Sequence, residues 1–88
     1  MTQEVLKDLY KEVTGNECTD IIELPSSGSN RRYFRLFGSQ SLIGAIGTNL
    51  LENEAFLYMD EHFHAKGINV PKVLAVSADR FCYLQEDL

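Results

Sequence analysis

The stretch from Asn49 to Gly67 reads NLLENEAFLYMDEHFHAKG and predicts the longest helix of the chain. Asn49 is a favoured N-cap residue, while Glu52 in the first turn and Lys66 in the last turn carry charges that suit the helix dipole. Gly67 can adopt the left-handed conformation that ends many helices. We therefore expect a helix from Leu50 to Lys66.

An apolar stripe predicts which face of this helix is buried. Phe56, Met59 and Phe63 recur at spacings of three and four residues, and Glu52 lies one turn before Phe56 on the same stripe. We expect the stripe to pack on a sheet, with these three apolar side chains buried and Glu52 pointing toward the sheet.

β-like runs flank the helix on both sides. Three runs precede it and two follow it, namely Cys18–Leu24, Arg31–Phe37, Ser41–Ile46, Val70–Ser77 and Phe81–Glu86. A further amphipathic helix is predicted from Thr2 to Thr14, with Gly15 as its stop. Because tight connections join the strands, the expected class is α+β: a five-stranded antiparallel sheet covered on one face, one packed long helix and an extra N-terminal helix.

Composition places the chain among ordinary globular domains. It has 88 residues, 44% of them apolar and 24% charged, with a net charge of −5. The acidic balance disfavours nucleic acid as a partner, and no apolar run approaches the ~20 residues that cross a bilayer. We expect a cytoplasmic protein with neither nucleic-acid nor membrane partners.

The metal-binding residue types do not form a site in the sequence. Cys18 and Cys82 lie in β-like runs without the spacing or the additional ligands of a zinc site, so we expect two reduced thiols. His62 and His64 differ by two positions and therefore diverge on a helix. We assign no metal ligands to this chain.

Four segments carry a resemblance to a known family. They are SGSNRRYFRL (27–36), ENEAF (52–56), GINVPKVLA (67–75) and YLQEDL (83–88). Together, over roughly residues 20–88, they resemble the aminoglycoside phosphotransferase and choline kinase group, whose protein-kinase-like small lobe has three strands, a helix and a final hairpin. The RRYFR strand is most similar to the bacterial cell-wall amino-sugar kinases, which phosphorylate the anomeric hydroxyl of N-acetylmuramate or N-acetylglucosamine.

The resemblance implies that residues 1–88 form one domain, the N-terminal nucleotide-binding lobe of a truncated phosphotransferase. Its parts would be an N-terminal helix (1–16), the sheet with its helix (17–84) and the start of a hinge (85–88). In this family the catalytic aspartate and the magnesium ligands lie in a C-terminal lobe, within H-x-D and I-D segments that this sequence lacks.

These relatives use ATP or another nucleoside triphosphate with Mg²⁺, bound mostly with that C-terminal lobe, and phosphorylate a small hydroxylated substrate such as an amino sugar. The resemblance therefore implies a kinase as the full-length protein. It implies no catalytic residue in this chain and no activity of the chain alone.

The resemblance also suggests which residues contact the nucleotide. The loop Ser26–Asn30 has the place of the phosphate-covering loop, and Ser29 and Asn30 are its candidate contacts. The alternative is a plain hairpin tip, for which serine, glycine and asparagine are favoured by turn chemistry alone. Leu84 and Phe34 are candidates for an apolar slot, although core packing explains them equally well.

The third strand, SLIGAIG, lacks the lysine that usually grips the phosphates in kinases. Strand alternation places Arg32 with Phe34, and Arg31 with Tyr33, on opposite faces. If the Phe34 face is the nucleotide side, Arg32 replaces the lysine and Glu52 is its partner. The alternatives are a solvated Arg32 and a Glu52 that merely favours the positive end of its helix.

Two other functions remain open at this point. A free-standing α+β domain without catalytic aspartates fits a non-catalytic binding or interaction module. The missing strand-three lysine also fits a pseudokinase lobe. A complete module should end in a capped or polar tail, whereas the E-D-L segment breaks off without a stop signal, so we expect a fragment.

Overall fold

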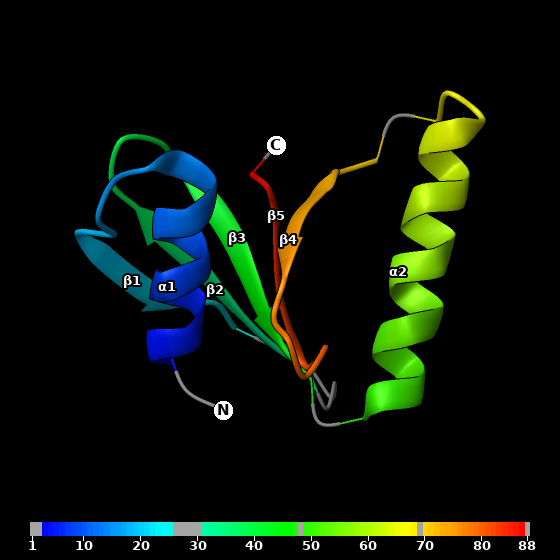
Figure 1. Ribbon diagram of the computed structural model, residues 1–88, viewed down its shortest axis with the longest axis horizontal. Helices are drawn as coiled ribbons and strands as arrows, with labels where there is room; N and C mark the ends of the chain where they lie inside the picture. Colours follow the sequence, from blue (N-terminus) through cyan, green and yellow to red (C-terminus); the bar gives the residue numbers. More distant parts are fainter. Residues whose placement is uncertain (1–2, 26–30, 48, 69, 88) are drawn as a thin grey trace.

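The computed structural model describes residues 3–25, 31–47, 49–68 and 70–87. The elements follow in the order α1 (Gln3–Thr14), β1 (Asp20–Glu23), β2 (Arg32–Phe37), β3 (Leu42–Ile46), α2 (Leu50–Ala65), β4 (Val73–Val76) and β5 (Cys82–Glu86) (Figure 1). Each lies within an element predicted from the sequence. The predicted α+β class is therefore confirmed.

The five strands form one antiparallel sheet in the order β1-β2-β3-β5-β4. The first three strands form a meander, and α2 then carries the chain past β5 to the edge, where β4 turns back to pair with β5. The β4–β5 register shifts between Val73 and Ala75. The predicted five-stranded antiparallel sheet is confirmed.

Helices cover both faces of this sheet, so the expectation of one covered face is wrong. Figure 1 shows α1 and α2 on opposite sides of the strands. Side chains of a strand alternate between faces, and in β2 Phe34 packs in the cluster that contains α1, whereas Tyr33 packs in the cluster that contains α2. The hydrophobic face of α1 needs its own apolar surface, which the Phe34 side of the sheet supplies.

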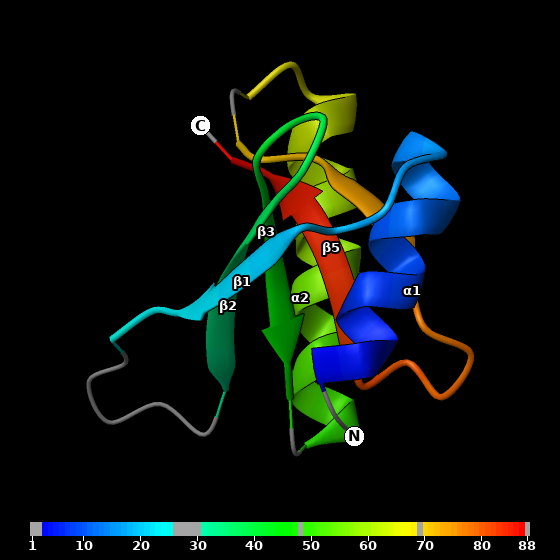
Figure 2. The same cartoon turned by 90° about the vertical axis from the view of Figure 1, so that its left-hand side faces the viewer.

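The larger core lies beneath α1. Leu6, Leu9 and Tyr10 of α1 are buried against β3 and β5 residues such as Leu42 and Leu84. In Figure 2, α1 lies against β3, β5 and β4 while β1 and β2 extend beyond it. Because Leu84 is fully buried in this layer, it does not line an open apolar slot. The same holds for Phe34, so the core interpretation applies to both.

The ends of α2 follow the local sequence signals. Asn49 caps the helix by accepting a hydrogen bond from the backbone N–H of Glu52 at 3.1 Å. The helix ends at Ala65, Lys66 is the C-cap, and Gly67 adopts φ +77°. Neither helix of the described residues is long and apolar enough to cross a membrane.

The buried face of α2 differs from the predicted stripe. The buried residues are Asn53, Leu57 and Asp60, whereas Met59 is 51% exposed. Apolar residues occur on several sides of this helix, so their spacing does not distinguish one inward face. The rotation of α2 about its own axis follows instead from tertiary hydrogen bonds. Asn53 faces inward because its side chain bonds with Arg31 and with the carbonyls of Arg80 and Phe81. The prediction that Met59 is buried is wrong.

Candidate functional site

Of the sequence-predicted site residues, the two that the structure describes, Arg32 and Glu52, do not converge. Ser29 and Asn30 lie outside the described residues. Arg32 is exposed and donates two hydrogen bonds to the Glu23 carboxylate of β1, from Nη2 at 2.8 Å and from Nε at 3.0 Å. Its guanidinium lies 5.2 Å from the ring centroid of Phe34. Arg32 thus belongs to the α1 face of the sheet, and the prediction that it points toward α2 is wrong.

Glu52 is exposed on the first turn of α2 rather than directed at the sheet. The predicted Arg32–Glu52 pair does not form, because Arg32 binds Glu23 instead, and the hydrogen bond from Arg32 lowers the pKa of Glu23. The inward position one residue along is Asn53, which is fully buried. The side chain that lies between α2 and the sheet is therefore a neutral amide.

The cation that contacts the sheet-facing side of α2 is Arg31. Its Nη2 donates to Oδ1 of Asn53 at 3.0 Å, and its guanidinium lies 5.1 Å from the ring centroid of Phe56 and 5.9 Å from that of Tyr83. The two rings stack on each other with centroids 5.2 Å apart. Arg31 is thus held against this aromatic pair by a hydrogen bond and by cation–π attraction.

Asn53 can present only its oxygen to Arg31. Its Nδ2 donates to the backbone carbonyls of Arg80 at 3.1 Å and Phe81 at 3.0 Å. Both amide hydrogens are used by the β4–β5 connection, so Oδ1 must face the guanidinium. The buried amide therefore connects three parts of the chain: α2, the β4–β5 turn and the start of β2.

The surroundings of Arg31 keep its guanidinium charged and raise the pKa of the neighbouring Tyr83. Burial acts against the charge of Arg31, but its hydrogen bond to Tyr33 and the attraction of Tyr83, Tyr33 and Glu52 outweigh it and raise its pKa. Burial raises the pKa of Tyr83, whose ring is fully enclosed. The site therefore carries a positive charge over a neutral aromatic surface.

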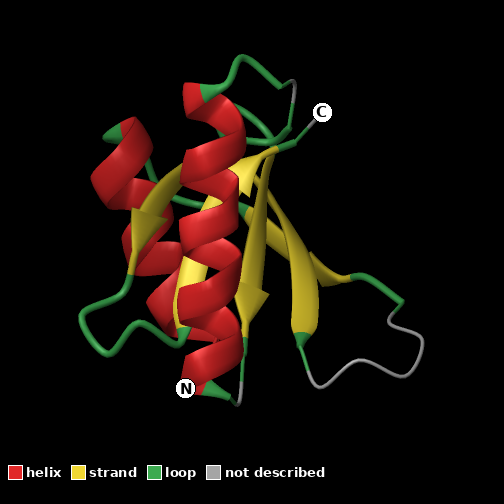
Figure 3. Ribbon diagram, turned by 90° about the vertical axis from the view of Figure 1, so that its right-hand side faces the viewer, coloured by secondary structure: helices red, strands yellow, loops and turns green. Residues whose placement is uncertain are grey.

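An apolar groove runs along α2 beside the end of β5. It has a volume of about 290 Å³ and is lined by Phe56, Met59, Asp60, Phe63, Val70, Pro71 and Gln85. In Figure 3, α2 crosses in front of the strands. The groove lies on the same side of α2 as Phe56, the ring over which Arg31 lies.

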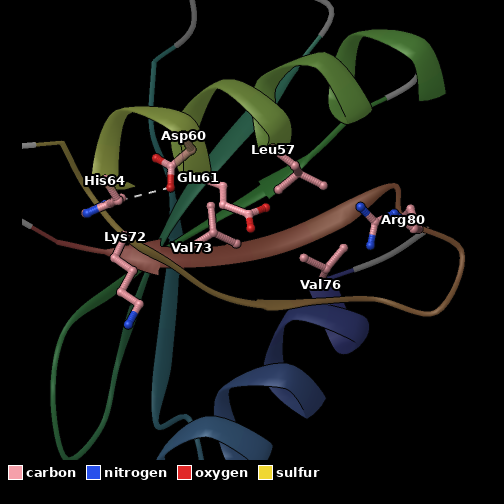
Figure 4. A pocket seen from close by; sticks show the side chains of 8 residues that line it. All are labelled: Leu57, Asp60, Glu61, His64, Lys72, Val73, Val76 and Arg80. Atoms are coloured by element: carbon pink, nitrogen blue, oxygen red, sulfur yellow. Dashed lines mark ion pairs between the residues drawn. The ribbon is translucent and has the colours of Figure 1, made fainter. Parts of the chain in front are cut away.

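A second cavity, of about 320 Å³, lies on the other side of α2 against β4. Its lining residues are Leu57, Asp60, Glu61, His64, Lys72, Val73, Val76 and Arg80 (Figure 4). Asp60 and His64 approach within 3.8 Å, but Lys72 and Arg80 lie at opposite ends of the cavity. Its charged groups do not converge on one point, so this cavity is the weaker candidate.

Two residues of the predicted hinge, Glu86 and Asp87, are tied to the sheet. Asp87 lies 2.9 Å from Nε of Arg35 and also accepts a hydrogen bond from the hydroxyl of Ser41. The side chain of Glu86 accepts from the backbone N–H of Lys72 at 2.8 Å. These carboxylates therefore hold neighbouring segments of the sheet together.

Sequence reasoning missed Arg31 and Asn53, although both lie in the segments that carry the resemblance. Alternation correctly grouped Arg31 with Tyr33, but it did not say which face of β2 meets the long helix. Asn53 gave no signal, because asparagine in a first turn is common on exposed helices.

No protein-family model matches the chain, and no curated protein matches it at a significant level.

Proposed function

We propose that this chain is the nucleotide-binding lobe of a small-molecule phosphotransferase. A second lobe would supply the catalytic aspartate and the magnesium ligands, and the acceptor would be a hydroxylated molecule such as an amino sugar. By itself the chain would hold a nucleotide without transferring its phosphate, since phosphoryl transfer needs the base and the metal as well.

One observation carries this proposal: the path of the chain through the sheet. Three antiparallel strands lead into α2, and a final hairpin pairs with the third strand through β5. The small lobe of protein-kinase-like enzymes has the same order of three strands, a helix and a hairpin. Because fold alone does not establish function, the four segments that resemble the phosphotransferase group are needed as independent support.

The chemistry around Arg31 and the nearby apolar groove agrees with such a role. Binding a triphosphate needs a fixed cation, and binding a base needs apolar or aromatic surface. Arg31 lies over two stacked rings, and an apolar groove follows the same helix toward Gln85 at the end of β5.

The test is a transfer assay on the protein that joins this lobe to its large lobe. We expect label from γ-labelled ATP with Mg²⁺ to reach at least one member of a panel of sugars, amino sugars and amino alcohols. Nucleotide binding without transfer to any member would support the pseudokinase alternative instead.

An interaction module is the second candidate, and one observation favours it. Leu51 is 82% exposed, Tyr58 70% and Met59 51%, so α2 presents large apolar side chains to solvent. Exposed apolar surface of this kind often meets another protein. Failure of the protein to bind any nucleotide would favour this candidate over both kinase interpretations.

A further inference from the structure

We propose that the apolar groove beside α2 binds a small organic cation, an ammonium group on an apolar body, whose charge pairs with the carboxylate of Asp60. The groove is the cavity of about 290 Å³ that lies along α2 beside the end of β5. The inference goes beyond the proposed function and does not rest on it, because this ligand needs neither a phosphate nor a second lobe.

Asp60 is a buried carboxylate that accepts no hydrogen bond from any residue that the structure describes. Its side chain is only 9% exposed, and its one ionic neighbour in the described part of the chain is His64, whose Nε2 lies 3.8 Å from Oδ1 (Figure 4). This distance is too long for a hydrogen bond, and the pair is ionic only when the imidazole is protonated. Because buried carboxylates are normally paired or hydrogen-bonded, a donor that reaches Asp60 would be strongly favoured.

The cations near Asp60 lie on the side of α2 away from the groove. His64, Lys72 and Arg80 line the second cavity and not the groove, and the charged ends of Lys72 and Arg80 extend away from Asp60 (Figure 4). Arg31 contacts one ring of the groove but is not itself a lining residue. Among the described residues that line the groove, none carries a positive charge. A cationic ligand therefore complements the charge of the groove.

A second acceptor reaches the groove from the sheet. Gln85 of β5 follows Leu84, which packs beneath α1, so alternation places Gln85 on the α2 face together with Tyr83. Its Oε1 is buried and accepts no hydrogen bond from the residues that the structure describes. An ammonium group has three N–H donors and no acceptor, so it supplies the hydrogen bonds that Asp60 and Gln85 lack.

The rest of the lining selects an apolar body for the ligand. The other lining residues are apolar, namely Phe56, Met59, Phe63, Val70 and Pro71. A cavity of about 150 Å³ holds benzene, so the groove has room for one ring with a short arm. The aromatic side chains also attract a cation through their ring faces. The groove therefore suits an aromatic amine better than a polar amine such as an amino sugar.

The experiment titrates the isotope-labelled chain with phenethylamine and follows the methyl signals of Met59 and Val70 by NMR. Phenethyl alcohol keeps the ring without the charge, and methylammonium keeps the charge without the ring. We expect phenethylamine to shift both methyl signals saturably, with a Kd on the order of 1 mM, as is usual for a ligand of this size. The two matched compounds should bind at least about tenfold more weakly, since each lacks either the charged hydrogen bond or the apolar contact.

Two variants test the role of the carboxylate. Asp60→Asn removes the charge and keeps the size of the side chain. Glu61→Gln is the matched control, because this neighbouring carboxylate lines only the second cavity. We expect Asp60→Asn to weaken phenethylamine binding at least about 10-fold and to change the affinity for phenethyl alcohol less than about twofold. Glu61→Gln should leave both affinities within about twofold of the wild type.

Equal affinities for the amine and the alcohol would mean that the groove is merely apolar, and would overturn the inference. So would an equal loss of affinity in Glu61→Gln, or shifts confined to Val73 and Val76, which would place the cation in the second cavity. Concentration-dependent shifts of Met59 and Val70 without added ligand would assign the groove to a second copy of the chain instead. If Asp60→Asn fails to fold, the comparison of the amine with the alcohol on the wild-type chain decides.

Discussion

Replacement of Asn53 by alanine removes the amide that connects α2, the β4–β5 turn and Arg31. Two hydrogen bonds to backbone carbonyls and one from the guanidinium disappear. A neutral hydrogen bond contributes about 1 kcal/mol and a charged one about 1.5–3 kcal/mol, although Arg31 can regain water. Alanine is the better helix former by roughly 0.5 kcal/mol. We therefore expect Asn53→Ala to lower the free energy of unfolding by about 2–4 kcal/mol.

Gly47→Ala tests the same contact from the other side. The added methyl group overlaps the amide of Asn53, so the substitution should cost about 1–3 kcal/mol in the wild-type background. In the Asn53→Ala background the amide is gone and the methyl group has space. The double variant should then be more stable than the sum of the two single effects, by about 1–3 kcal/mol.

Urea unfolding at 25 °C, followed by far-UV circular dichroism, measures all four proteins of this cycle. Thermal melting serves where a variant is too unstable for extrapolation. Strict additivity within about 0.5 kcal/mol would refute the packing of Asn53 against Gly47. So would an Asn53→Ala variant as stable as the wild type.

Three further predictions concern single side chains. Met59→Ala should cost less than about 1 kcal/mol, whereas Leu57→Ala on the buried face should cost about 2–4 kcal/mol; equal losses in urea unfolding would contradict the observed rotation of α2. Iodoacetamide should modify Cys18 well before Cys82, because Cys82 is fully enclosed and burial raises the pKa of its thiol; equal rates by mass spectrometry of the native chain would contradict this. Burial also raises the pKa of Tyr83, so above about pH 10 the unfolded chain loses a proton that the folded chain keeps, and stability should fall by up to ~1.4 kcal/mol per pH unit. Tyr83→Phe should lack that part of the fall between pH 8 and pH 11, and an identical fall in both proteins would show that Tyr83 is not buried as described.

Much of the fold could be predicted because its signals are local. Asn49 caps α2, and Gly15 and Gly67 adopt positive φ where the helices were expected to stop. The strands lie where β-branched and aromatic runs alternate with turn residues. Each of these signals depends on neighbours within a few positions in the chain, so no tertiary information is needed to interpret them.

The candidate site was predicted less well, because its residues depend on which face of the sheet packs against α2 and which against α1. Alternation in β2 separates Arg31 from Arg32 without saying which face meets α2. From the sequence, an apolar strand face can be either part of a ligand slot or part of the core. In the structure Phe34 lies beneath α1 as part of the core. The prediction that Met59 is buried was wrong for a similar reason. Apolar side chains occur on several sides of α2, so their spacing alone does not show which side faces the sheet.

The sequence by itself determined the order, type and approximate ends of the elements, because capping, turn and strand preferences act between near neighbours. The tertiary structure alone decided which faces meet and which polar groups are buried. Asn53 shows the reason: its amide is satisfied by carbonyls 27 and 28 residues away and by a guanidinium 22 residues away. Only when those partners lie together does an ordinary helix asparagine become a buried residue that orients the Arg31 guanidinium.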